Sequence, residues 1–225
     1  MELSDIFEGM ESIGFNVTSE KAEFAVFSLE DTVADYCENF DPVDKYFTNF
    51  TVEVFAAGDC RSNIGTIGFL KGTSIESEMC IEEEFGFLEL CDMASGELLR
   101  MAEAIIDADG CVDERICPPD RNIMYIDKIY IEENCRSFGV GRYLLDNVND
   151  IFNRVFNYRH YVCIVKPFPQ IKRGNYVEDL KEATSKQHER LNNFYKRAGY
   201  QEVDNTGFLH KIQPDPYGFL FESEE

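Results

Sequence analysis

An arginine and two glycines, in the pattern Arg136-x-x-Gly139-x-Gly141, directly follow an apolar run at residues 123–131. Glycine has no Cβ, so the backbone can adopt a positive φ and a ligand can approach it closely. Apolar residues recur at helical spacing after the turn and predict a helix that begins there. Its first N–H groups and the positive end of its dipole would face the turn, which suits a phosphate. We therefore predict a phosphate-bearing ligand.

Asp127 is an acidic residue inside an otherwise apolar stretch. A carboxylate in such a place is costly unless it faces a cleft or has a partner. Strand alternation would put Tyr125, Asp127 and Ile129 on one face of the sheet. Two interpretations stay open: Asp127 faces a cleft, or it forms a salt bridge, for example with Lys71 on a neighbouring strand.

Composition narrows the class of protein. The chain has 225 residues, of which 44% are hydrophobic and 28% charged, the balance of a globular protein. A net charge of -22 argues against general nucleic-acid binding, because phosphates would be repelled. It would attract cationic acceptors, although the simpler interpretation is that the surface carboxylates serve solubility. No apolar stretch has membrane-spanning length and the N-terminus lacks signal-peptide features. We expect a cytoplasmic protein with no membrane partner.

The spacing of the cysteines and histidines does not match that of a metal-binding site. The eight cysteines include no C-x-x-C pair, and the histidines at 160, 188 and 210 lie far apart in the sequence. Neither distribution is typical of a zinc site, so we expect no metal. Without a secretion signal, free thiols are favoured over disulfides.

The elements that must position these residues follow from periodicity and turn signals. Strands are predicted at residues 23–29, 50–57, 64–71, 123–131, 160–166, 201–203 and 207–212. Residues 1–22 are expected to form a short helix and a loop, and a helix is expected over residues 29–40. We interpret residues 72–120 as an insertion that carries one helix, capped by Ser95.

The boundaries of the predicted elements are marked more clearly in the second half of the chain. A long amphipathic helix should follow the glycine turn, and residues 167–174 should form a proline-bearing polar loop. Thr184 and Gln187 form a capping box for a helix that ends at Ala198, with Gly199 after it. The tail from residue 213 is acidic.

The glycine turn and the later phrase Phe194-Tyr-Lys-Arg-Ala-Gly-Tyr200, in this order, resemble the GNAT (N-acetyltransferase) superfamily, in a bacterial-type member. The resemblance covers about residues 50–71 and 122–212. It implies a single domain over residues 1–225, with an N-terminal extension at 1–49 and a helical insertion at about 72–120. The implied fold is α/β: a mixed, twisted central sheet of about six or seven strands flanked by helices, with splayed fourth and fifth strands.

The resemblance also implies acetyl-CoA as co-substrate, held in the wedge between those two strands. Exposed backbone of Ile129 and Ile131 would pair with the pantetheine amides, as an unpaired strand edge can do. The cationic residues nearest the phosphates would be Arg136, Arg142, Lys196 and Arg197; the alternative is that they are ordinary solvated surface residues. Backbone amides of the turn would bind the pyrophosphate; they belong to Phe138, Gly139, Val140, Gly141, Arg142 and Tyr143.

Many family members place a cofactor-binding asparagine seven residues before the tyrosine of the phrase, where this chain has His188. Asn192 lies nearer that tyrosine and is the asparagine that we assign to the cofactor. Tyr195 stands where many members hold the tyrosine that protonates the CoA sulfur, and a phenol is a plausible donor to a thiolate. Some members have a carboxylate at about the depth of Asp127. For Tyr195 the structural alternative is packing in the core.

Together these implications describe an acetyl-CoA-dependent N-acetyltransferase that acts on a primary amine by direct attack, with Tyr195 as general acid. The acceptor would be a small cationic amine or a protein amine, approached by the loops at 72–120 and 167–179. The alternative is a non-catalytic acyl-CoA-binding or regulatory module. Expected partners are acetyl-CoA and the amine, with no nucleic acid, in a monomer or homodimer.

Overall fold

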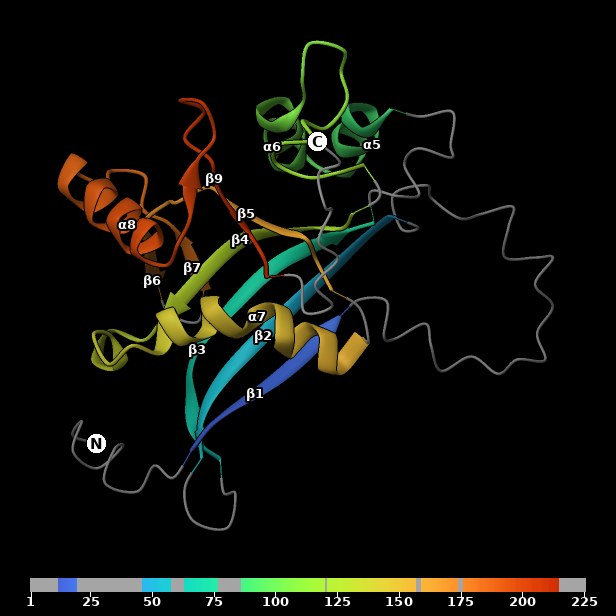
Figure 1. Ribbon diagram of the computed structural model, residues 1–225. Coiled ribbons are helices and arrows are strands. Elements are labelled where there is room, and N and C mark those ends of the chain that lie inside the picture. Colours follow the sequence, from blue (N-terminus) through green and yellow to red (C-terminus); the bar gives the residue numbers. More distant parts are fainter. Residues whose placement is uncertain are drawn as a thin grey trace, which may run out of the picture.

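A seven-stranded mixed sheet forms the centre of the computed structural model (Figure 1). The structure describes residues 12–19, 46–57, 63–76, 86–119, 121–156, 159–173 and 176–214. In spatial order the strands are β1 (Ser12–Ser19), β2 (Phe47–Ala57), β3 (Asn63–Ile75), β4 (Ile123–Ile131), β5 (Val162–Val165), β9 (Leu209–Ile212) and β8 (Gln201–Glu202). Every neighbouring pair is antiparallel except β4 and β5, which run parallel. The predicted mixed sheet flanked by helices is confirmed.

Strands β4 and β5 separate halfway along β4. They pair only from Ile123 opposite Val162 to Ile126 opposite Val165. On its other side β4 stays paired with β3 to its end at Ile131. Prolines at 167 and 169 follow β5, and proline cannot donate to a ladder, so the pairing has no means of continuing there. The predicted divergence of the fourth and fifth strands is confirmed.

A β-bulge lies at the point of divergence. Lys71 of β3 stands opposite Lys128, whereas the next residue, Gly72, stands opposite Ile126. Asp127 is therefore the extra residue on β4, without a partner in the register. Bulges bend a strand and redirect side chains. Asp127 is placed at the bend where the two strands separate.

The bulge also resets the alternation of side chains along β4. Ile126 belongs to one hydrophobic cluster, and Ile129, three residues later, packs against that same cluster. Tyr125 belongs to the other cluster, on the opposite face. The expectation that Tyr125, Asp127 and Ile129 share one face is therefore wrong, because strict alternation holds only in a strand without a bulge.

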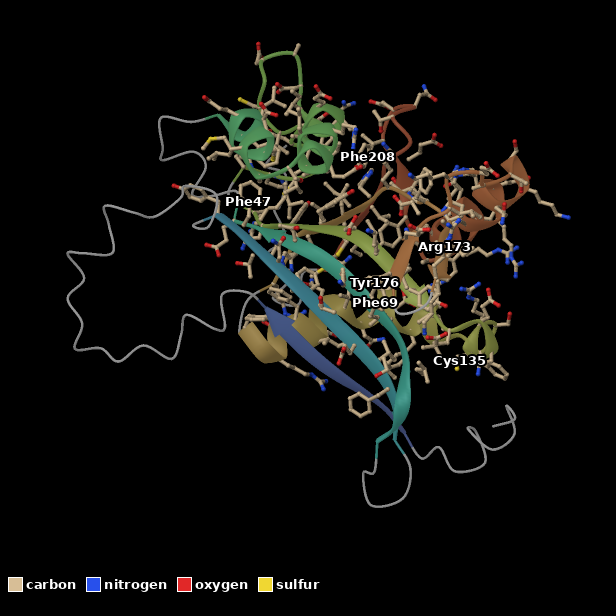
Figure 2. All side chains as sticks on the ribbon, turned by 180° about the vertical axis from the view of Figure 1, so that it is seen from behind. Phe47, Phe69, Cys135, Arg173, Tyr176 and Phe208 are labelled. Atoms are coloured by element: carbon tan, nitrogen blue, oxygen red, sulfur yellow. The ribbon has the colours of Figure 1, made fainter. Side chains whose placement is uncertain are left out.

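Two short helices, α5 (Phe87–Ala94) and α6 (Gly96–Ile105), pack against one end of the sheet, on one of its faces (Figure 2). Phe47 of β2 and Phe208 lie beside this pair. The expected cap is present, since Ser95 Oγ accepts from the N–H of Leu98 at 3.1 Å. The sequence predicted one helix in this insertion, whereas the structure has two. The nearly continuous apolar stretch at residues 85–91 hides the helical period of α5.

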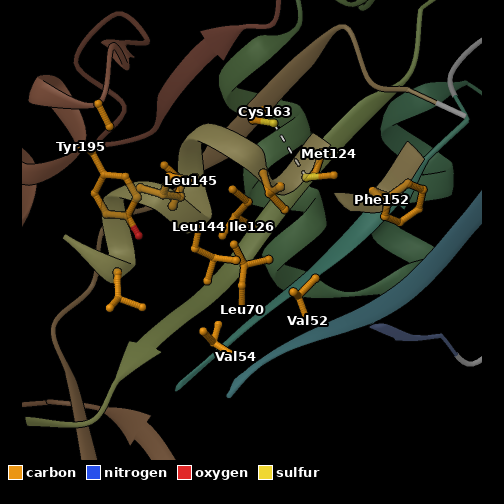
Figure 3. Close-up of a cluster of buried hydrophobic side chains, with 14 of the residues drawn as sticks. Val52, Val54, Leu70, Met124, Ile126, Leu144, Leu145, Phe152, Cys163 and Tyr195 are labelled. Atoms are coloured by element: carbon orange, nitrogen blue, oxygen red, sulfur yellow. Dashed lines mark hydrogen bonds between the residues drawn. The ribbon is translucent and has the colours of Figure 1, made fainter. Parts of the chain in front are cut away.

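A single long helix, α7 (Val140–Phe156), covers the opposite face (Figure 1). Its buried side chains, among them Leu144, Leu145 and Phe152, pack on Val52 and Leu70 of the sheet (Figure 3). The predicted amphipathic helix after the glycine turn is confirmed. A short 3₁₀ turn, η3 (Glu133–Cys135), separates β4 from that turn.

Beyond β5 the chain forms a small antiparallel ribbon, β6 (Gln170–Arg173) and β7 (Tyr176–Asp179), where a polar loop was predicted. Its strands are four residues each and mostly polar, so they lack the apolar alternation that marks a strand. Helix α8 (Ser185–Arg197) follows with its predicted capping box complete. Gly199, just after its last turn, has a φ of 88°, the left-handed conformation that glycine permits.

Residues 12–19 form strand β1 of the sheet, which corrects the short helix and loop predicted over residues 1–22. The strand predicted at 23–29 and the helix predicted at 29–40 lie outside the described residues. Within the described ranges, no helix is both long and apolar enough to span a membrane. The described cysteines, at 91, 111, 117, 135 and 163, are free thiols.

Candidate functional site

A cavity of about 940 Å³ occupies the wedge where β4 and β5 separate. Its walls are the second half of β4, the glycine turn, the segment after β5 and helix α8. Gln170 of the β6–β7 ribbon and Leu180 just beyond it also line the cavity. The ribbon is tied to the end of β4, because Lys172 Nζ contacts the carboxylate of Glu132. The parts of the chain that the sequence singled out thus meet around one space.

The glycine turn presents unpaired amides to this cavity. Gly139 has a φ of 85°, and Ser137, two residues earlier, has a φ of 70°. The first helical bond runs from the N–H of Tyr143 to the carbonyl of Gly139, at 2.9 Å. The N–H groups of the residues between them have no acceptor within the helix, as at any helix start. The turn is therefore built to receive an anion.

Gly141 has a different role from Gly139. A Cβ at this position would lie 3.4 Å from Phe194 Cζ and 3.6 Å from Ile131 Cγ1. These are ordinary van der Waals distances, so the first turn of α7 lies against both the end of β4 and helix α8 and would have room for a Cβ at this position.

The second half of β4 offers backbone groups to the cavity. The N–H of Glu132 donates to the carbonyl of Ile67 at 2.9 Å, toward β3. Backbone groups alternate sides in an antiparallel ladder, so those of Ile129 and Ile131 face away from β3. The carbonyl of Ile131 already accepts from Arg136 Nε at 2.8 Å. Ile129 and the N–H of Ile131 therefore remain as the groups that an extended ligand could pair with.

Cationic side chains outnumber carboxylates in the cavity. The two carboxylates are Asp127 and Glu189. The six cationic residues are Arg136, Arg142, Lys166, Lys186, Arg190 and Arg197. The whole chain has the opposite balance, with 21 Lys and Arg against 43 Asp and Glu. A locally positive cavity in an acidic protein favours a polyanionic ligand.

Two of these arginines fix the walls of the cavity. Arg136 ties the turn to β4 through the carbonyl of Ile131, and its guanidinium lies over the Tyr130 ring. Arg142 Nε pairs with Asp146 Oδ2 at 2.5 Å, and its Nη1 donates to the carbonyl of Arg197. The N-terminus of α7 is thereby joined to the C-terminus of α8.

Tyr195 lines the cavity from α8 and is only 3% exposed. Its ring meets those of Phe194 and Tyr200 edge-on, at centroid distances of 5.2 and 5.5 Å. It lies next to Leu145 at one end of the apolar cluster (Figure 3). Burial raises the pKa of Tyr195 well above its usual value, so the phenol stays protonated at neutral pH. Tyr195 is therefore packed in the core and also in contact with the cavity.

Asp127 lines the cavity where β5 stops pairing with β4. Its side chain is 41% exposed, and its carboxylate lies 3.7 Å from Lys128 Nζ. Partial burial raises the pKa of Asp127 above its usual value, while the charge of Lys128 opposes this. Lys71 stands opposite Lys128 with its Nζ 5.6 Å from the Phe69 ring. The carboxylate faces the cleft, and its ion pair is with the adjacent residue on its own strand.

Not all the predicted site residues reach the cavity. The cavity is not lined by Phe138, Tyr143, Asn192 or Lys196, whereas Asn193 does line it. The Phe138 side chain is 56% exposed, and the amide of Tyr143 is used by the first turn of α7. His188 packs against Phe168, with the ring centroids 5.3 Å apart.

Three cavity cations were not identified from the sequence: Lys166, Lys186 and Arg190. A signal for two of them was available, because Lys186 and Arg190 share a helical period with Asn193 and Arg197 in α8. In the described part of the chain, no group of three or more His, Cys, Asp and Glu residues is arranged to hold a metal.

No family model matches the sequence, and no curated protein is a significant match to it. Among solved structures, Arabidopsis thaliana NAA60 in complex with acetyl-CoA is 12% identical with a TM-score of 0.38, covering 90% of this chain and 100% of that one. An agmatine N-acetyltransferase is 12% identical with a TM-score of 0.39, covering 72% and 74%. A KacTA–DNA complex is 10% identical with a TM-score of 0.39, covering 89% and 93%. With values this low, the function of this chain has to be inferred from its own cavity.

Proposed function

We propose that this chain is a GNAT-type, acetyl-CoA-dependent N-acetyltransferase that transfers the acetyl group to a primary amine. One observation carries the proposal. A single cation-rich cavity lies between two diverging strands and joins an anion-binding helix start to unpaired strand backbone and to Asp127. An anionic, amide-containing, extended acyl donor matches those features in chemistry and in shape.

The donor would bind in two parts. The amides of Gly139, Val140, Gly141 and Arg142 would hold the pyrophosphate at the positive end of α7. The pantetheine amides would pair with Ile129 and with the N–H of Ile131, because hydrogen bonds along a strand edge suit an extended amide chain. The acetyl group would then lie toward the bulge, where the strands begin to separate.

In the transfer step, the neutral amine nitrogen attacks the thioester carbonyl carbon. A C–N bond forms, the C–S bond breaks, and the bonding electron pair leaves with sulfur. Asp127 takes the proton that nitrogen loses, directly or through a water molecule. The raised pKa of Asp127 makes it a stronger base than an ordinary aspartate. The products are the N-acetyl amine and the CoA thiol.

Tyr195 would act on the departing sulfur. A protonated phenol can donate a hydrogen bond to sulfur as negative charge develops there. Complete proton transfer is uphill, because a thiol has a pKa near 8.5 whereas burial raises that of Tyr195. Its main contribution is therefore the hydrogen bond in the transition state, and the thiolate then takes its proton from solvent.

The test is a thiol-release assay with acetyl-CoA over a panel of primary amines and peptides. For Tyr195→Phe we expect turnover to fall roughly 100-fold, while the KM for acetyl-CoA changes little. Tyr200→Phe is the matched control, because Tyr200 is equally buried in the same cluster but does not line the cavity. Its hydroxyl has no hydrogen-bond partner in the described structure, so its removal should leave turnover unchanged.

The same assay separates this proposal from the main alternative. Tight acetyl-CoA binding with no thiol release on any amine would identify a non-catalytic acyl-CoA-binding module. Full activity in Tyr195→Phe across the pH range would remove Tyr195 from the mechanism but leave the acetyltransferase standing. That the chain does not bind nucleic acid stays a prediction, which a mobility-shift assay with DNA and tRNA would test.

A further inference from the structure

Helix α8 has an exposed basic face whose residues border the cavity. Lys186, Arg190, Asn193 and Arg197 follow one another at spacings of four, three and four residues, which places them on one side of a helix. All four line the cavity. We call this set the α8 basic face. Its C-terminal end lies at the glycine turn, since the carbonyl of Arg197 accepts from Arg142.

The cations of the α8 basic face are not neutralised by the protein. Like charges four residues apart on a helix repel, so Lys186 and Arg190 are mildly unfavourable to each other. Neither forms an ion pair with a carboxylate in the described structure, although Glu189 lines the same cavity. Lys196, which lies outside the cavity, pairs with Glu202 at 3.2 Å.

An acidic chain has ample carboxylates to neutralise surface lysines and arginines. Leaving two of them unpaired and adjacent beside a cavity costs the free protein a little, and an anion that binds between them relieves this cost. A guanidinium and an ammonium together suit a phosphate oxygen cluster. The ligand of the cavity should therefore carry a second anionic group, apart from the one at the glycine turn.

We propose that Lys186 and Arg190 form a second anion subsite, which binds the 3′-phosphate on the ribose of acetyl-CoA. This inference rests on the proposed function, because it assigns a group of the same donor. A rise of 1.5 Å per residue puts Arg190 roughly 10 Å and Lys186 roughly 16 Å from Arg197 along the helix. The 3′-phosphate is attached to the ribose next to the pyrophosphate, so it lies within reach of long side chains on this face.

The acceptor is a less suitable source of the anion. It must present a neutral amine beside Asp127, and unpaired cations near its path would neither attract an ammonium nor serve the proton transfer. The donor, by contrast, brings three phosphates into a protein with a net charge of -22. Local cations beyond the pyrophosphate site would offset that repulsion.

The test uses two ligands that differ only in this phosphate, CoA and 3′-dephospho-CoA, with binding measured by calorimetry on the full chain. We expect the wild-type protein to bind CoA at least tenfold more tightly than dephospho-CoA. In the double variant Lys186→Gln, Arg190→Gln this ratio should fall to near one. Affinity for dephospho-CoA should stay within about twofold of wild type, because a charge-assisted contact to a missing group cannot be lost.

Lys196→Gln is the control: it removes one positive charge from the same helix, outside the cavity, and should keep the wild-type ratio. Circular dichroism checks that each variant is folded. Equal losses for both ligands in the double variant would overturn the inference, as would a wild-type protein that does not distinguish them. In both cases the wild-type chain still binds CoA, so the proposed function stands. A wild-type protein that binds neither ligand would overturn the proposed function as well.

Discussion

His160 is a buried histidine that the fold keeps neutral. It is 2% exposed, its backbone N–H donates to Asn149 Oδ1 at 3.0 Å, and its Nε2 lies 2.9 Å from Ser74 Oγ. Asn149 Nδ2 donates in turn to the carbonyl of His160. The network joins α7 to the segment before β5 and to β3. Burial lowers the pKa of His160 to about 3.

This pKa makes the fold acid-sensitive in a defined window. The unfolded chain takes up a proton near pH 6.5, whereas the folded chain resists protonation down to about pH 3. His160 therefore contributes stability that is fully present above pH 6.5 and is lost as pH falls toward 3, at up to about 1.4 kcal/mol per pH unit. Urea unfolding at pH 7 and pH 5 should show the loss.

The variant His160→Gln isolates this contribution. It removes the titrating ring but keeps a polar side chain near Asn149 and Ser74. We expect lower stability than wild type at pH 7 and a shallower decline between pH 7 and pH 5. An identical decline in both proteins would assign the acid sensitivity to carboxylates elsewhere.

The junction of β3 and β4 is the element on which the geometry of Asp127 depends. Gly72 stands beside the bulge, and a Cβ there would lie 2.4 Å from the carbonyl oxygen of Tyr125 and 2.9 Å from Phe50 Cζ. Both neighbours are held firmly, one by the backbone and the other by the core. The strands can approach this closely only because residue 72 is glycine.

Gly72→Ala should therefore destabilise the protein by roughly 1–3 kcal/mol and lower turnover, because the added methyl group pushes β4 away and displaces Asp127. Gly96→Ala is the control, since Gly96 begins α6 and has no atom within 4 Å of the added Cβ. It should raise stability by roughly 0.5–1 kcal/mol and leave turnover alone. Denaturant unfolding and thiol release give both readouts. Unchanged turnover in a destabilised Gly72→Ala protein would show that the bulge does not position Asp127.

Local sequence signals account for the elements that were predicted well. The turn at Gly139 and the capping box at Thr184 each lie within a few residues of the helix that they start, and both helices are present. The bulge at Asp127 could not be predicted this way, because it is a property of the register between two strands. The pattern of apolar residues in β4 is similar before and after Asp127, so the sequence of β4 does not reveal that Asp127 is an extra residue in the register.

The cavity was predicted in part for a similar reason. Ile129, Arg136 and Tyr195 carry motif positions, and each lines it. Lys186 and Arg190 belong to no motif, and their role depends on which side of α8 faces the wedge. That side is set by packing: Tyr195 is buried against the core, and the basic face lies on the opposite, exposed side of α8, where its residues border the cavity.

Across the whole molecule, the net charge of the chain and the local charge of the cavity have opposite signs. A net charge of -22 makes the folded chain repel itself, while the cavity gathers cations. Salt screens both effects, since the Debye length is about 10 Å at 0.1 M and about 3 Å at 1 M. Screening the self-repulsion stabilises the fold, and screening the cavity weakens its hold on a polyanion.

One salt series should therefore move two quantities in opposite directions. Raising NaCl from 0.05 to about 0.5 M should raise the Tm of the free protein and raise the Kd for acetyl-CoA, measured by thermal melts and calorimetry. In the double variant Lys186→Gln, Arg190→Gln the Tm should respond to salt as in wild type, because two charges change the net charge of -22 only slightly. Its Kd should respond less steeply, because two of the screened contacts are gone.

A falling Tm would mean that the ion pairs, such as that of Arg142 with Asp146, outweigh the self-repulsion. A Kd independent of salt would mean that amides, not cations, hold the donor.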